Sequence, residues 1–174
     1  MKKGFSRPKL GDIYELRLSK GVAYVQYVLR DAEPMQFGPV IRILPGVFLE
    51  RIADPNALAD QEERFLARYW IPGAVNDGDA VLVGHGEISA RFDQWPRFKN
   101  HPISKWRIWD STGVETEDPL KVEHYDLPLM ELVSHPTLVL RIESGWHPRD
   151  EVFHYNPELR ETYVKWEREK GQLS

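Results

Sequence analysis

Two pairs of residues have the types and the spacing that hydrolytic chemistry could use. His85 and Glu87 stand two positions apart in GHGE. His124 and Asp126 have the same spacing in HYD. In an extended strand, side chains two positions apart lie on one face, so each pair could present an imidazole and a carboxylate to a metal ion. Together the pairs could hold Zn²⁺ in a metal-dependent hydrolase.

The rest of the chain gives this chemistry little support. It has no His-Glu-x-x-His sequence and no His-x-His pair. It also has no Gly-x-Ser-x-Gly nucleophile motif, and PGAVNDGD lacks the Lys-Ser/Thr end of a phosphate-binding loop. Cysteine is absent, which excludes disulfides, a thiol nucleophile and a thiolate metal site. We therefore expect no cofactor and no catalytic residue, and the hydrolase stands as the alternative.

The charge distribution indicates a different kind of site. The 22 residues from Asp110 to Glu131 hold seven acids and one base, so they carry −6, while the other 152 residues sum to +2. This stretch is either a solvated surface or an acidic patch for a basic protein partner, whose association electrostatic attraction would accelerate. The residues that would form such a patch are Trp109 at the rim and Asp110, Glu115, Glu117, Asp118 and Glu123.

The elements that position these residues are expected to be mostly strands. Residues 13–18 and 22–29 are two β-rich runs separated by SKG, and positions 13–18 alternate between a largely polar and an apolar face, which predicts a hairpin. FGPVIRIL, DAVLVG and WRIWD read as further strands, with DAVLVG buried and WRIWD closed by the turn STG. Asp54 and Pro55 can start a short helix, and alternation from about Arg64 predicts a strand after it.

Two helices are expected in the second half. Ser134 is a good N-cap for a short helix in HPTLVLRIES, which would end before about residue 145 with Gly145 in the left-handed conformation. The β-branched residues of this segment leave a strand as the alternative. Val139 and Ile142 would face inward, and Trp146 would fold back as a buried plug.

The last helix is expected over about 157–170. Asn156 caps it, and Leu159, Tyr163 and Trp166 form an apolar stripe. The sequence thus predicts an α+β fold with a mainly antiparallel sheet, open or barrel-like, in its N-terminal half.

Composition limits the class of protein. A chain of 174 residues with 41% hydrophobic residues suits one domain, 1–174. The net charge of −4 offers no broad basic surface, so we expect no nucleic-acid partner. No apolar run approaches the roughly 20 residues of a membrane span, and MKKGFSRPKLGD lacks the apolar core of a signal peptide. We expect a cytoplasmic protein without a membrane partner.

The opening RPKLGDIYELRLSKGVAYVQYVL resembles that of immunity protein family 26 of bacterial polymorphic toxin systems. The later blocks VLVGHGEI, WPRFKN, WRIWD and LRIESGWHP follow in the same order, so the resemblance covers about 8–151. It implies an α+β domain that neutralises a cognate toxin by binding it.

The resemblance implies structural roles for Gly11, Asp12, Trp109, Gly145 and Trp146. Some relatives carry a phosphotriesterase label, so the resemblance implies that the alternative, a metal-dependent hydrolase, would be of the phosphotriester type, but no catalytic residue is carried over. A general protein-interaction domain is the remaining alternative.

Overall fold

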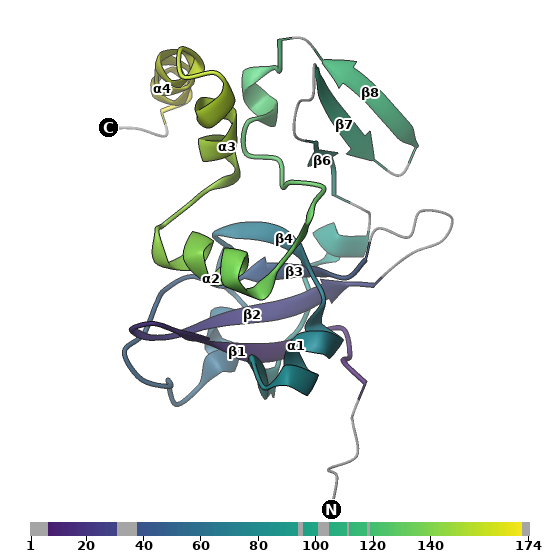
Figure 1. Cartoon of the computed structure of the whole chain (residues 1–174), viewed down its shortest axis with the longest axis vertical. Helices are drawn as coiled ribbons and strands as arrows, with labels where there is room; N and C mark the ends of the chain where they lie inside the picture. Colours follow the sequence, from purple (N-terminus) through teal and green to yellow (C-terminus); the bar gives the residue numbers. More distant parts are fainter. Residues whose placement is uncertain are drawn as a thin grey trace, which may run out of the picture. The chain divides into compact units, whose positions relative to one another are not determined.

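The computed structural model describes residues 7–30, 38–93, 96–100, 105–110, 112–117 and 119–171. They form an α+β fold, as the sequence predicts (Figure 1). The chain divides into two compact units, each made of two stretches: unit 1 holds 1–95 and 131–145, and unit 2 holds 96–130 and 146–174. The single domain expected from composition therefore stays a prediction.

Unit 1 is built on a six-stranded sheet with the order β5-β1-β2-β3-β4-β9. Its pairs are antiparallel except for β4 with β9, so the predicted mainly antiparallel sheet is confirmed. Within the described residues the sheet is open, with β5 and β9 at its edges. Its strands are β1 (Asp12–Leu18), β2 (Gly21–Leu29), β3 (Val40–Ile43), β4 (Phe65–Tyr69), β5 (Ala80–His85) and β9 (Leu132–Val133).

The predicted hairpin is β1 and β2, paired from Ile13↔Gln26 to Leu18↔Gly21. The predicted polar face of β1 is wrong, because every residue from Asp12 to Leu16 is buried. The strand lies between β2 and β5, and both of its faces are covered. Glu15 tolerates this burial because Arg51 Nε donates to its carboxylate at 2.6 Å, and this hydrogen bond lowers the pKa of Glu15 against the effect of burial.

The predicted buried strand DAVLVG is β5, but its burial is wrong. Val81 and Leu82 are 36% and 49% exposed, because β5 is an edge strand with a neighbour on one side only among the described residues. The short 3₁₀ helix η1 (Pro55–Leu58) begins after Asp54, whose side chain accepts from Asn56 N, and β4 follows as predicted.

Two α-helices complete unit 1. The first, α1 (Ile71–Asp77), starts directly after β4 and was not predicted. The second, α2 (His135–Glu143), confirms the predicted helix, and the Ser134 side chain accepts from Thr137 N. Its inward face differs in part, since Leu138 and Ile142 are buried while Val139 is half-buried.

Unit 2 contains a three-stranded antiparallel sheet, β6 (Phe98–Lys99), β7 (Trp106–Asp110) and β8 (Gly113–Glu117). The 3₁₀ helix η3 (Val122–His124) follows β8. Two helices supply the other side of its core: α3 (Pro148–Tyr155) and α4 (Leu159–Glu169). The core residues are Trp106, Ile108, Leu120, Tyr125, Val152, Phe153 and Tyr163.

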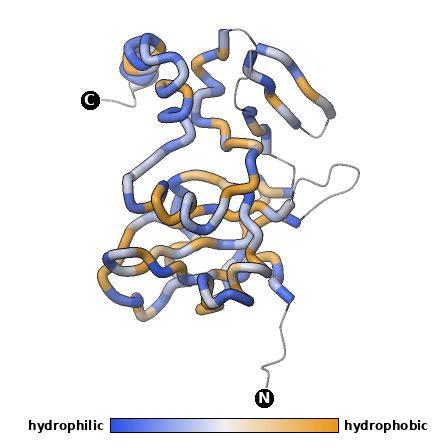
Figure 2. The backbone as a smooth tube through the Cα atoms, in the orientation of Figure 1, coloured by the Kyte–Doolittle hydropathy of each residue, from blue (hydrophilic) through white to orange (hydrophobic). Residues whose placement is uncertain are grey.

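The predicted C-terminal stripe is confirmed. Tyr163 is buried, and Leu159 and Trp166 pack against the same cluster. Figure 2 shows hydrophobic and hydrophilic residues alternating around α4. Asn156 has another role, because it ends α3 instead of capping α4. The helix α3 was not predicted: Pro148 occupies its first turn, where proline costs no hydrogen bond.

No helix within the described residues is long and apolar enough to span a bilayer.

Candidate functional site

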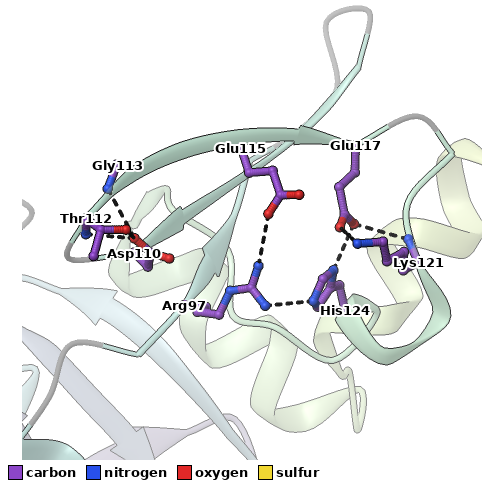
Figure 3. Close-up of polar contacts among 8 residues, drawn as sticks. All are labelled: Arg97, Asp110, Thr112, Gly113, Glu115, Glu117, Lys121 and His124. Carbon is purple, nitrogen blue, oxygen red and sulfur yellow. Dashed lines mark hydrogen bonds and ion pairs between the residues drawn. The ribbon is translucent and has the colours of Figure 1, made fainter.

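The acidic residues of the predicted patch that the structure describes lie on the β7–β8 hairpin of unit 2 and in η3, and Figure 3 shows Asp110, Glu115 and Glu117. The register pairs Ile108 with Glu115 and Trp106 with Glu117. Directly paired residues share one face of a sheet, so both glutamates lie on the face that buries the two apolar residues. The acids therefore border the core of unit 2 and do not line the outer face of the hairpin.

Glu117 is held by residues of its own unit. It is 5% exposed, and its carboxylate lies 3.0 Å from Lys121 Nζ and 2.8 Å from His124 Nδ1. Burial alone would raise the pKa of Glu117, but the hydrogen bonds from His124 and Lys121 outweigh it and lower the pKa. In this structure Glu117 stabilises the turn after β8 and is not open to a partner.

Asp110 closes the turn between β7 and β8. Its Oδ1 accepts from Thr112 N at 2.7 Å, Thr112 Oγ1 at 2.6 Å and Gly113 N at 3.1 Å. Those hydrogen bonds, first the one from the Thr112 hydroxyl, lower the pKa of Asp110. The predicted turn STG is thus stabilised by the aspartate before it, as Asx-turns are.

Arg97 joins this network, although no pattern in the sequence pointed to it. Its Nη1 lies 2.8 Å from His124 Nε2, and its Nη2 lies 3.6 Å from Glu115 (Figure 3). Since Arg97 can only donate, Nε2 of His124 accepts, and the ring proton sits on Nδ1, facing Glu117. Arg97 precedes Glu115 by 18 positions, so no local spacing joins them.

Two predicted acids are exposed. The Glu115 side chain is 60% exposed despite the nearby Arg97, and Glu123 is exposed. Asp118 lies outside the described residues. On the opposite face of the hairpin from Glu115, half-buried Trp109 pairs with Val114, which is 49% exposed. The exposed groups of this region are therefore the edge of β8, two carboxylates and the side chain of Val114.

The two His/carboxylate pairs belong to different units. His85 and Glu87 belong to unit 1, whereas His124 and Asp126 belong to unit 2. Within unit 2, Asp126 accepts from Tyr163 Oη at 2.7 Å instead of facing a shared metal position with His124. Over the described ranges, no group of three or more His, Cys, Asp or Glu side chains could hold a metal ion.

His85 has a different carboxylate partner. Its Nδ1 lies 3.1 Å from Asp12 Oδ1, and the other oxygen of Asp12 accepts from Lys9 N and Tyr14 Oη. Gly11, just before, has φ +92°, and a Cβ there would lie 2.7 Å from Gly86 O. Both residues of the Gly-Asp pair thus serve the packing of β1 against β5.

Gly145 and Trp146 follow the end of α2. Gly145 has φ +71°, the left-handed conformation predicted, and a Cβ added there would meet nothing within 4 Å beyond its chain neighbours. Backbone conformation alone therefore accounts for glycine here. Trp146 is half-buried, less than a core plug would be.

Comparison with models of known protein families, with curated proteins and with solved structures finds no match for this chain. The resemblance to immunity protein family 26 rests on the quoted blocks of sequence alone.

Proposed function

We propose that this protein binds a basic protein partner through the exposed edge of β8 and through η3. The partner would be a cognate bacterial toxin, which the protein neutralises by covering it. The observation that carries the proposal is the exposed carboxylate of Glu115 on an edge strand, followed by exposed Glu123 in the most acidic stretch of the chain. Such a protein would act in the cytoplasm of the cell that makes the toxin.

The edge of β8 supports a protein partner over a small ligand. Among the described strands, β8 pairs with β7 only. Val114, Glu115 and Thr116 are all exposed along it. An unpaired edge offers backbone hydrogen bonds to a partner strand or loop, and the flanking side chains then decide which partner fits.

The two exposed carboxylates would act mainly on the association rate. Attraction between exposed charges steers encounter and weakens as salt screens it. Glu117 and Asp110 are engaged in internal hydrogen bonds, so replacing them would disturb the hairpin as well as its charge. A test of binding must therefore change Glu115 and Glu123.

The experiment compares two double charge reversals. Glu115→Lys with Glu123→Lys should slow association with the toxin encoded beside this gene by at least ~10-fold at low salt and flatten its salt dependence. Glu50→Lys with Glu161→Lys changes the net charge equally at exposed sites elsewhere and should have a much smaller effect. Surface plasmon resonance measures both, and far-UV circular dichroism checks the fold. Equal association rates for the two variants would refute the proposal.

A further inference from the structure

A pocket of about 370 Å³ opens on unit 1, where β4 runs into α1 and β9 runs into α2. Its volume lies in the range of roughly 300–1,000 Å³ that small-molecule sites occupy. The pocket belongs to unit 1, whereas the acidic hairpin belongs to unit 2, and the inference drawn from the pocket does not rest on the proposed toxin binding.

One wall of the pocket is apolar and exposed. Trp70 and Leu132 line it, and they are 54% and 53% exposed. The indole of Trp70 lies against the backbone of Gly73, where an added Cβ would be 2.5 Å from Cδ1 of the ring. Because Gly73 has no side chain, the Trp70 ring has room to lie across the start of α1. A large exposed aromatic ring that lines a concave site is suited to contact with a ligand.

Acidic residues also line the pocket. They are Asp77 and Asp79, and no Lys or Arg is among the described residues of the lining. Burial, then the charges of Asp79 and Asp77, raise the pKa of the Tyr69 hydroxyl, which belongs to the same lining. Both carboxylates therefore act electrostatically on a group of the pocket.

His135 lines the pocket beside these carboxylates. Tyr69 Oη lies 2.7 Å from His135 Nδ1. Where the hydroxyl donates this hydrogen bond, Nδ1 accepts and the ring proton is on Nε2, 3.9 Å from Asp79 Oδ1. In that arrangement the two aspartates are the only charged groups among the described residues that line the pocket.

We propose that this pocket binds an organic cation, an ammonium or guanidinium group on a short hydrocarbon chain. The cation would lie between Asp77 and Asp79, where charge-assisted hydrogen bonds are strongest. The hydrocarbon would cover the apolar side chains of Trp70 and Leu132. A free alkylguanidine and an arginine side chain share this chemistry. The inference does not depend on the proposed toxin binding.

The test uses n-butylguanidine and its neutral isostere n-butylurea as probes. The indole N–H signal of Trp70, assigned by its loss in Trp70→Phe, is followed by NMR during titration. We expect a saturable shift with butylguanidine at a Kd of about 1 mM or tighter, and binding of butylurea at least 10-fold weaker. No saturable shift, or equal binding of the two probes, would overturn the proposal.

Variants test the assigned groups. Asp77→Asn and Asp79→Asn should each weaken butylguanidine binding about 10-fold or more, while Asp93→Asn, an exposed acid outside the lining, should leave it unchanged. All three should fold, since none of the aspartates is buried. If binding survives in both pocket variants, the carboxylates do not form the site.

A pair of peptides identifies the source of the cation. N-acetyl-Gly-Arg-Gly-amide is compared with the same peptide containing citrulline. Binding of butylguanidine but not of the arginine peptide assigns the pocket to a free cation. Arginine-peptide binding at least as tight as that of butylguanidine, and lost with citrulline, assigns it to a protein side chain. An arginine peptide that binds no better than its citrulline form, together with no butylguanidine binding, contradicts a cation site altogether.

Discussion

The ammonium group of Lys99 is fully buried in unit 2, where it donates to the carbonyl oxygens of Tyr125 and of Pro148. Burial lowers its pKa to about 7, although the charges of Asp126 and Glu151 act in the opposite direction. The lysine links β6 to the start of α3 through these two hydrogen bonds. This burial has a cost, because a charged amine loses its hydration when the unit folds.

The shift predicts a pH-dependent stability. Between about pH 7 and pH 10 the unfolded chain keeps a proton on Lys99 that the folded chain has released. Stability contributed by this group therefore rises with pH across that window, by up to about 4 kcal/mol, and is level below it. Urea unfolding at pH 6.5, 8 and 9.5 measures the slope.

Lys99→Met should remove this rise, whatever its effect on absolute stability. Lys165→Met, at a side chain that is 80% exposed, serves as the control and should keep the slope of the natural chain. An unchanged slope in Lys99→Met would mean that the lysine remains protonated in the folded state.

The partners of the acidic side chains could be predicted only in part at the level of residues. The turn after β7, which Asp110 closes, involves adjacent residues only, and the sequence predicted a turn there at STG. Glu117 and Lys121 are four apart, but nothing in the sequence shows that the carboxylate is buried. Arg97 reaches Glu115 only because the chain between them returns through β7. Long-range pairing thus decides which acids remain available to a partner.

At the scale of elements, local signals succeeded where they were complete. Alternation with a turn predicted β1 and β2, and Ser134 with Gly145 bounded α2. The position of a strand in its sheet left no such signal, so β5 was expected to be buried. The helix α3 was not predicted, although proline is common in the first turn of a helix, as Pro148 is in α3.

The inward face of α2 makes a prediction about stability. Leu138 has no exposed surface, whereas Leu140, two positions on, is 64% exposed. Leu138→Ala should lower the free energy of unfolding by about 2–5 kcal/mol, since it leaves a cavity in unit 1. Leu140→Ala should change it by less than about 0.5 kcal/mol. Thermal or urea unfolding checks both, and similar losses would place the packed face of α2 elsewhere.

At the scale of the molecule, the two units could not be predicted from the sequence. Each is assembled from two separate stretches, and the chain passes between them after residues 95, 130 and 145. No glycine- and serine-rich linker marks these points. The division depends on which segments pack together. In unit 2, Trp106 and Ile108 of β7 share one hydrophobic core with Val152 and Tyr163 from the last part of the chain.

A truncated chain, 1–145, tests whether the units fold independently. It keeps both stretches of unit 1 but removes α3 and α4, which supply Val152, Phe153 and Tyr163 to the core of unit 2. We expect the amides of β7 and β8 to lose their protection from hydrogen exchange, because Trp106 and Ile108 would face water. The amides of β1 to β4 should keep theirs. If β1 to β4 lose protection as well, the chain folds as one cooperative domain, as its length and composition predict.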